Sequence, residues 1–467
     1  MTDASSTATD IASAVRAGTI PAARIVDRTV ARIERLDAAL NAFTHLDVDR
    51  ARAAAARIDR LVADGKDPGP LAGATFAVKN LYDIQGVVTL AGSKINADHP
   101  PAIADSPLIE RLTAAGAILM GALNMGEYAY DFTGENRHYG PSRNPHDPAR
   151  MSGGSSGGSG TATASAMVSF ALGSDTNGSI RVPSSLCGLF GLKPSFGRLS
   201  RARTFPFCAS LDHLGPLARS ATDLALAYDT MQGYDAADPV CVDRPVEPAA
   251  PSVSGDASAL RVSIATGYFA SLAQPEALAA VDRVAKALGT TRTVDIPRAQ
   301  EARSAAYVIT ATEAAVLHRE RLRARPMDFD PDVRDRFFAG AMAPAQWYVQ
   351  AQRFRAWYRK AVLKLFEDTD IIVAPATPTT APAIGQKMFS LGGKDWPVRA
   401  NLGIFTQPVS FIGLPVVAAP IDGVSDLPIG VQIVAAPWRE ADALCVAAAL
   451  EREGVAVSRI AEGNRGA

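Results

Sequence analysis

Histidine and cysteine are scarce in this chain. Among 467 residues, six are histidine and four are cysteine. Cys187, Cys208, Cys241 and Cys445 form no C-x-x-C pair and show no zinc-type spacing, which predicts free thiols in a reducing compartment. The histidines likewise lack the spacing of metal ligands, so we expect neither a metal site nor another cofactor.

The chain also lacks an excess of charge and a long apolar run. Its formal net charge is −1, which gives no electrostatic reason to expect nucleic acid or an anionic membrane as a partner. No apolar run approaches the roughly 20 residues of a membrane-spanning helix. The first ten residues are polar and lack the basic start and apolar core of a secretory signal. We therefore expect a soluble, cytoplasmic protein.

The apolar content is ample for a large core. Hydrophobic residues make up 48% of the chain, enough for one large core or two. Helical patterns alternate with short apolar strands, which favours an α/β fold with helices covering a sheet. Residues 8–38 are expected to form two helices, residues 41–45 and 370–375 strands, and residues 235–255 a long surface connection.

Two serine-bearing segments stand out in the first half of the chain. Residues 153–159 read Gly-Gly-Ser-Ser-Gly-Gly-Ser, and residues 173–183 read Gly-Ser-Asp-Thr-Asn-Gly-Ser-Ile-Arg-Val-Pro. Between them an Ala/Thr-rich run ends in an apolar stretch over residues 167–172. This order predicts a glycine-rich loop, a short helix, a buried strand and a tight turn that presents Ser179.

Three simpler interpretations of the first segment fit poorly. A flexible linker should separate independent cores, whereas apolar segments lie close on both sides. A phosphate-binding loop would end in Gly-Lys-Ser/Thr, which is absent. A nucleophile elbow matches the pattern G-x-S-x-G, but it needs a hydrophobic strand before it. Residues 143–150, which precede the segment, are polar and proline-rich.

Lys79 ends an apolar, strand-like segment over residues 74–78. Burying an ammonium group is costly unless it is paired or loses its proton. Taken alone, Lys79 would be interpreted as a side chain that reaches from the strand end into solvent. Beside two glycine-rich serine segments it becomes a candidate general base with a lowered pKa.

Lys79 and the two serine segments together resemble the three defining motifs of the amidase signature family. Their order and the spacing from Ser155 to Ser179 match that family, as do residues 186–194 and 210–220. The resemblance implies a single α/β amidase signature domain built on a large, twisted, mixed β-sheet with helices on both faces.

The same resemblance implies how the chain is divided within that domain, residues 1–467. Residues 1–65 would form an N-terminal helical region and residues 66–235 the catalytic core. Residues 256–467 would supply the remainder of the same sheet and the walls of the substrate pocket. Residues 406–409 and 428–432 resemble the closing strands of the family.

Catalytic roles are also implied by the resemblance. Ser179 would be the nucleophile, Ser155 would relay its proton, and a neutral Lys79 would be the base. The Gly154–Ser155 peptide bond would be cis. Four consecutive backbone N–H groups would form the oxyanion hole, those of Thr176, Asn177, Gly178 and Ser179.

Several further residues are expected to support the site or line it. We interpret Asp175 and Arg181 as a pair that holds the nucleophile's turn, and Ser156 as a supporting residue. Candidate substrate-binding residues are Tyr128, Tyr130, Asn136 and His213. A carboxylated substrate would also need a cation, and the sequence does not show which arginine faces the pocket among Arg201, Arg203, Arg321 and Arg399.

Within the family, residues 90–96, 139–147 and 176–179 resemble the branch that hydrolyses carboxylated biuret during s-triazine degradation. This implies hydrolysis of a small, nitrogen-rich, carboxylated urea derivative, with an acyl-enzyme on Ser179 and release of ammonia. Members of the branch pair with a small helical subunit resembling the C subunit of tRNA-dependent amidotransferases, so a dimer or heterotetramer is expected.

Other functions stay open at this point. The chain could be the glutaminase (A) subunit of such an amidotransferase, although that group usually has glutamine and glycine where this sequence has His213 and Asn177. It could also be a broad-specificity aryl or aliphatic amidase. A non-catalytic binding protein is disfavoured because Lys79, Ser155 and Ser179 are all present.

Overall fold

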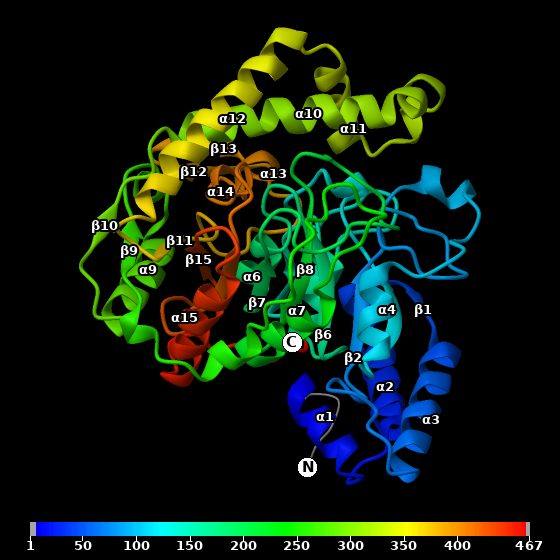
Figure 1. The fold of residues 1–467 in the computed structure, drawn as a ribbon. Coiled ribbons are helices and arrows are strands. Elements are labelled where there is room, and N and C mark those ends of the chain that lie inside the picture. Colours follow the sequence, from blue (N-terminus) through cyan, green and yellow to red (C-terminus); the bar gives the residue numbers. More distant parts are fainter. Residues whose placement is uncertain (1–5, 464–467) are drawn as a thin grey trace.

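An 11-stranded mixed sheet runs through the structure, which is a computed structural model describing residues 6–463 (Figure 1). Its strands lie in the order β1-β3-β2-β6-β8-β7-β14-β15-β11-β9-β10. Their bounds are β1 Phe43–Leu46, β2 Thr75–Lys79, β3 Ile118–Leu123, β6 Phe170–Asp175, β7 Phe190–Lys193, β8 His213–Ala218, β9 Val262–Ala265, β10 Thr293–Val294, β11 Ile371–Pro375, β14 Val416–Pro420 and β15 Gly430–Ala435. The α/β fold with a large mixed sheet is confirmed.

Parallel and antiparallel pairs occupy different parts of this sheet. β3, β2 and β6 are parallel neighbours, and so are β11, β9 and β10. Between these two groups, β6, β8, β7, β14, β15 and β11 pair antiparallel in succession. The parallel group β3-β2-β6 contains both Lys79 and the strand that leads to Ser179.

Around β2, the two faces of the sheet pack against different apolar clusters. Successive side chains of a strand point to opposite faces. In β2, Phe76 and Val78 belong to the larger cluster of buried apolar side chains, whereas Ala77 belongs to a second cluster. The helices over the larger cluster are α4 Pro107–Ala114, α7 Ala221–Met231, α9 Pro275–Ala287 and α15 Glu440–Arg452. Those over the second cluster are α1 Ala8–Arg16, α2 Ala22–Leu40 and α3 Val48–Ala63.

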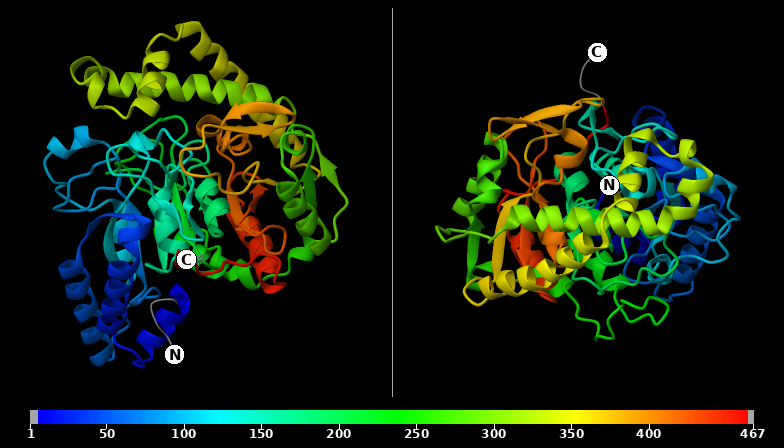
Figure 2. Two further views of the ribbon diagram at one scale, coloured as in Figure 1. Left: turned by 180° about the vertical axis from the view of Figure 1, so that it is seen from behind. Right: turned by 90° about the horizontal axis from the view of Figure 1, so that it is seen from above.

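Three helices form an arm across one end of the sheet, as two views of the ribbon show (Figure 1, Figure 2). They are α10 Ala299–Ala324, α11 Pro331–Ala341 and α12 Ala345–Leu365. α10 packs on both α11 and α12. The arm lies over the end of the sheet where β2 and β6 finish, and one of its side chains, Thr310, reaches the turn before Ser179.

Shorter elements fill the connections. The helices are α5 Gly157–Ala164, α6 Arg181–Cys187, α8 Tyr268–Ser271, α13 Val398–Asn401 and α14 Gln407–Ser410. Two hairpins pair β4 Arg143–Asn144 with β5 Asp147–Met151 and β12 Met388–Leu391 with β13 Lys394–Pro397. Of the long connection expected over residues 235–255, residues 235–249 contain no helix or strand, whereas Ala250–Ser254 forms a short 3₁₀ helix. Within residues 6–463, no helix is long and apolar enough to cross a membrane.

The prediction of one closing strand is wrong. Residues 406–409 do not form a closing strand but enter the short helix α14. Pro408 lies in the first turn of this helix, where its missing N–H would have no partner in any case. The other expected closing strand is present, because residues 430–432 belong to β15.

The core beneath the site gives a first testable prediction. Phe170 of β6 is fully buried and stacks on Phe76 of β2, with ring centroids 5.5 Å apart. Truncating a buried phenylalanine to alanine costs about 3–5 kcal/mol, so Phe170→Ala should clearly lower the midpoint of thermal unfolding. Met327→Ala is the control, because Met327 is 77% exposed. Equal midpoints for the two variants would contradict this description of the core.

Candidate active site

The carboxyl ends of two parallel strands bring Lys79 close to the serine segments. β2 ends at Lys79 and its parallel neighbour β6 ends at Asp175. Parallel strands present their carboxyl ends at the same edge of a sheet, where ligand sites commonly form. The first serine segment follows β5 and enters α5, and the second leads from β6 into α6.

Lys79 is a fully buried amine held by two hydroxyl groups. Its Nζ donates hydrogen bonds to Ser155 Oγ at 2.7 Å and to Ser174 Oγ at 2.9 Å. Within residues 6–463 it forms no ion pair with a carboxylate. Burial lowers the pKa of Lys79 to about 7, against the opposing effect of three more distant carboxylates, those of Asp175, Asp212 and Asp131. A large share of this lysine is therefore neutral at neutral pH.

The glycine-rich segment is fixed around Ser155. The Gly154–Ser155 peptide bond is cis, and Gly126 N donates to the Ser155 carbonyl oxygen at 3.1 Å. The neighbouring Ser156 Oγ donates to the Ser174 carbonyl oxygen and accepts from Ser174 N, at 3.2 and 3.3 Å. Ser156 thereby ties the first serine segment to the end of β6.

The turn before Ser179 carries unpaired backbone donors. In the part of the chain that the structure describes, the four N–H groups from Thr176 to Ser179 donate to no other residue. All four residues are buried. Buried backbone N–H groups without a partner are rare in folded proteins, and such a run is suited to hold a negatively charged oxygen.

A buried ion pair holds this turn. Arg181 Nε and Nη2 donate to the two carboxylate oxygens of Asp175, both at 2.9 Å, and both side chains are fully buried. Ile180 N also donates to Asp175 Oδ2 at 3.2 Å. Burial alone would raise the pKa of Asp175, but the charge and hydrogen bonds of Arg181 outweigh it and hold this pKa below its usual range.

Side chains from distant parts of the sequence complete the turn. Thr310 Oγ1 of α10 accepts from Asn177 Nδ2 at 2.9 Å, and Thr406 Oγ1 donates to the Asn177 carbonyl oxygen at 2.6 Å. On the other side, Thr176 Oγ1 donates to Asp212 Oδ1 at 2.6 Å. No sequence pattern assigned a role in the site to Thr310 or to Thr406, although Thr406 begins the segment 406–409 that resembles a closing strand of the family.

Ser179 is buried, and its hydroxyl group has no hydrogen-bond partner among the described residues. Its side chain belongs to a residue that is 3% exposed, and its hydroxyl makes no hydrogen bond with any residue in 6–463. A contact between Ser155 Oγ and Ser179 Oγ is therefore not present in the structure, and the proton relay between them stays a prediction. Such catalytic contacts often tighten only when substrate binds.

The four candidate substrate-binding residues differ in whether their side chains keep a polar group without a hydrogen-bond partner. All hydrogen-bonding positions of the Asn136 side chain are occupied. Its Nδ2 donates to the carbonyl oxygens of Gly92 and Met125, and its Oδ1 accepts from two backbone N–H groups. Asn136 therefore holds its own loop, and the expected role in binding is not supported. Tyr128 donates to Asn96 Oδ1 at 3.0 Å and packs its ring on His318.

His213 and Tyr130 also differ from one another. His213 Nδ1 lies 2.6 Å from the Leu211 carbonyl oxygen, and its Nε2 has no partner within residues 6–463. Burial lowers the pKa of His213 well below its usual range, so this ring is neutral and faces the interior. Tyr130 packs on Phe207 with ring centroids 4.9 Å apart, and its hydroxyl donates to none of the described residues. His213 and Tyr130 are thus the two candidates with a polar group that has no partner among the described residues.

The arginines considered for a substrate carboxylate already have partners. Arg201 pairs with Asp238, and Arg203 with Glu110. Arg399 contacts Asp131, Glu135 and Asp332 together. Arg321 lies over the ring of Phe205. The first three arginines are thus engaged in ion pairs within the fold.

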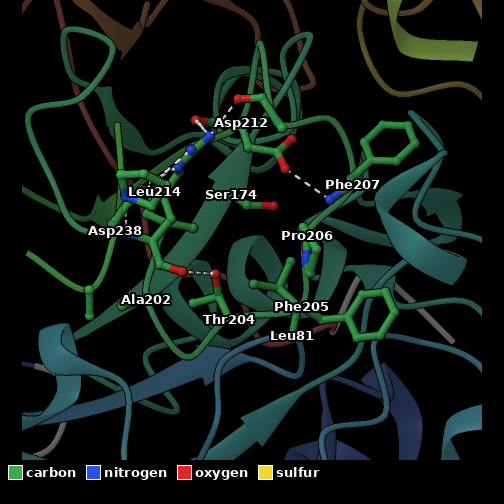
Figure 3. Close-up of a pocket in the computed structure, with 14 residues that line it drawn as sticks. Leu81, Ser174, Ala202, Thr204, Phe205, Pro206, Phe207, Asp212, Leu214 and Asp238 are labelled. Carbon is green, nitrogen blue, oxygen red and sulfur yellow. Dashed lines mark hydrogen bonds and ion pairs between the residues drawn. The ribbon is translucent and has the colours of Figure 1, made fainter. Parts of the chain in front are cut away.

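A cavity of about 240 Å³ is lined in part by Ser174, which accepts a hydrogen bond from the buried Lys79. Figure 3 shows Ser174 near its middle, with Asp212, Leu214 and Phe207 around it. Its lining includes neither Ser155 nor Ser179. Sequence reasoning missed Ser174, although one signal was there: it lies near the carboxyl end of β6, next to the strand that ends in Lys79.

Comparison with known proteins identifies the family. The family model described as Amidase matches residues 24–444. The chain belongs to the amidase family. AtzE, a 1-carboxybiuret hydrolase subunit of Pseudomonas sp. (strain ADP), is 53% identical to this amidase over 449 residues, which are 96% of this chain and 98% of that protein.

Two further relatives match this amidase over nearly its whole length. A solved structure, described as an unexpected vestigial protein complex that reveals the evolutionary origins of an s-triazine catabolic enzyme, matches with a TM-score of 0.96 and 52% identity, over 97% of this chain and 100% of the other. The A subunit of the Glutamyl-tRNA(Gln) amidotransferase of Azotobacter vinelandii (strain DJ / ATCC BAA-1303) is 36% identical over 470 residues, 94% of this chain and 96% of that protein.

Gly178 gives a prediction about the unpaired N–H groups. Its φ is +142°, and an added Cβ would lie 2.0 Å from Thr406 Oγ1. Gly178→Ala must therefore displace the turn, and losing one oxyanion donor typically lowers kcat about 10²–10³-fold. We expect a loss of this size in amide hydrolysis, with the protein still folded by circular dichroism.

The matched control is Gly393→Ala. Gly393 also has a positive φ, of +73°, but an added Cβ would meet nothing within 4 Å. This variant tests the conformational cost without the collision, and we expect it to keep its activity. Unchanged hydrolysis in Gly178→Ala would show that the geometry of this turn does not matter for catalysis.

Proposed function

We propose that this amidase hydrolyses a small, nitrogen-rich, carboxylated urea derivative of the 1-carboxybiuret type and releases ammonia. The observation that carries the proposal is the 53% identity to a 1-carboxybiuret hydrolase subunit, over nearly the whole of both chains. The A subunits of amidotransferases match at 36% identity or less among those compared. The substrate class is therefore taken from the more similar relative.

The proposed reaction begins with attack by Ser179 Oγ on the amide carbonyl carbon. The Ser179 proton passes to Ser155 Oγ as the Ser155 proton passes to the neutral Nζ of Lys79. The carbonyl oxygen becomes an oxyanion, and the four N–H groups from Thr176 to Ser179 are aimed to stabilise it. Preorganised donors of this kind are among the largest contributions to catalysis of acyl transfer.

The second half of the reaction returns the proton. Lys79 gives it back through Ser155 to the leaving nitrogen, the carbon–nitrogen bond breaks, and ammonia departs from an acyl-enzyme on Ser179. A water molecule then attacks the acyl group, losing its proton through the same two groups to Lys79. The ester bond to Ser179 Oγ breaks, and that oxygen regains a proton, which restores the starting state.

We further propose that the enzyme works in the cytoplasm with a small helical subunit similar to the C subunit of amidotransferases. The related structure at 52% identity is described as a protein complex. All four cysteines of this chain are free and buried, which suits a reducing compartment. Co-expression with a short reading frame next to the gene, followed by size-exclusion chromatography, tests the assembly.

Lys79 fixes the expected pH dependence. Its pKa is lowered from 10.5 to about 7, and only the neutral amine accepts a proton. As the pH falls below that value, kcat/KM should decrease about tenfold per pH unit, and above it kcat/KM should level off. A profile that is flat from acid to alkaline pH, or one that rises until about pH 10, would contradict a base with this pKa.

Lys193 provides the control for that profile. It is a second fully buried lysine, and burial also lowers its pKa to about 7. Its Nζ donates to the Pro194 carbonyl oxygen and to neither Ser155 nor Ser174. If Lys79 is the base, Lys193→Met should keep the decrease below pH 7, whereas Lys79→Met should lose activity at every pH.

Ammonia release from a panel of amides tests the function itself. The panel contains 1-carboxybiuret, biuret, allophanate, glutamine and an aryl amide, and 1-carboxybiuret should give the highest kcat/KM. Ser179→Ala should lower that rate to the background. Ser159→Ala is the control, because Ser159 is a buried serine of the first serine segment whose Oγ donates only to the Leu172 carbonyl oxygen. Preference for glutamine or the aryl amide would replace the proposed substrate, and an active Ser179→Ala variant would remove the nucleophile.

A further inference from the structure

Ser174 carries the second hydroxyl group that Lys79 Nζ contacts, besides that of Ser155. Its Oγ accepts from Lys79 Nζ at 2.9 Å. Its backbone is held by Ser156 through two hydrogen bonds. The hydroxyl hydrogen of Ser174 has no acceptor among residues 6–463. One of the two hydroxyls that hold the buried amine is therefore free to donate.

The free hydroxyl borders the cavity shown in Figure 3. Ser174 is among its lining residues, and so are Pro206, Ala209, Ala237 and Pro239, which are exposed. The cavity thus connects Ser174 with the protein surface. Lys79, Ser155 and Ser179 do not line it, so the Ser174 hydroxyl is the group that links this cavity to the lysine.

We propose that Ser174 is a positioning residue that aims the lone pair of Lys79 at Ser155 and passes surplus protons from Lys79 to the cavity. The proposal rests on the proposed function, because it assumes that neutral Lys79 is the base. It adds a third hydroxyl, with a separate route to solvent, to the proton network of the enzyme.

The positioning role follows from the shape of a neutral amine. Such an amine has two N–H groups and one lone pair, and the lone pair must face the Ser155 hydroxyl to accept its proton. At least one N–H must then point elsewhere and needs an acceptor inside the protein, because an unpaired buried donor is costly. Ser174 Oγ, at 2.9 Å from Nζ, is that acceptor.

The relay role follows from the free hydroxyl hydrogen. When Lys79 is an ammonium ion, an N–H bond breaks as its proton forms a bond to Ser174 Oγ. The original O–H bond of Ser174 breaks at the same time, and its proton passes to water in the cavity, which carries the charge away as hydronium. Lys79 is left neutral and Ser174 unchanged, so no other reactant is needed.

The charged groups around Lys79 stay in place when Ser174 is changed. Three carboxylates face the lysine from different elements, and each has its own partner: Asp175 contacts Arg181, Asp131 contacts Arg399, and Asp212 contacts Thr176. All three favour the ammonium form. Ser174 accepts a hydrogen bond from that form too, so its removal should lower the pKa of Lys79 further.

A reagent that needs no amide substrate separates this proposal from the proposed function. An alkyl fluorophosphonate reacts with an activated serine, forming a P–O bond as the P–F bond breaks and fluoride leaves. Its rate of labelling at Ser179, followed by mass spectrometry against pH, reports whether Lys79 can take the Ser179 proton. In Ser174→Ala we expect the maximal rate to fall about tenfold, within the range of general-base effects, and the acidic decrease to move to lower pH.

Two variants make the result specific. Ser174→Thr keeps the hydroxyl and should restore both the rate and the pH profile of the wild type. Thr204→Val removes another hydroxyl of the same cavity, one that donates to the Arg201 carbonyl oxygen and not to Lys79, and should change neither. Wild-type rate and profile in Ser174→Ala would overturn the proposal, and so would failure of Ser174→Thr to restore them. Absence of labelling at Ser179 in the wild type would instead overturn the proposed function.

Discussion

The structure depends on one buried amine that is left without a counter-ion. Lys79 Nζ is fully buried and touches two hydroxyl groups, but no carboxylate lies within ion-pair distance among residues 6–463. Water no longer stabilises its charge there, and hydroxyl groups replace only part of that stabilisation. The amine therefore loses its proton at a pH where an ordinary lysine keeps it. This loss of the proton is what the proposed role of Lys79 as the base requires.

The same constraint explains how the surrounding charges are arranged. Asp175, Asp131 and Asp212 are close enough to raise the pKa of Lys79, and each is engaged by another group. The Asp175–Arg181 pair has two effects, because it also holds the turn whose four N–H groups remain unpaired. Removing one member would leave a buried charge, which typically costs about 3–5 kcal/mol. The proposed base and the proposed oxyanion site thus share one buried network of charges and hydrogen bonds.

Much of this site could be predicted from the sequence, because it rests on local signals. An apolar strand ending in Lys79, a glycine-rich serine segment and a turn after a buried strand are each recognisable from a few residues. Residues 406–409 were harder to assign, since a four-residue segment with a proline suits a strand end and a helix start equally. The arginines and Ser174 could not be assigned, because their roles depend on partners distant in the sequence, and Asn136 was expected to bind substrate. Only the folded chain shows that Asn136 is saturated by its own loop.

The ionisation of Lys79 can be measured directly. In protein labelled with carbon-13 at lysine Cε, an NMR titration follows each lysine, and the Lys79→Met variant identifies the signal of Lys79 by its absence. We predict a midpoint near 7 for Lys79. A midpoint near the ordinary value of 10.5 would show that this amine stays charged at neutral pH, and it would contradict its role as the base.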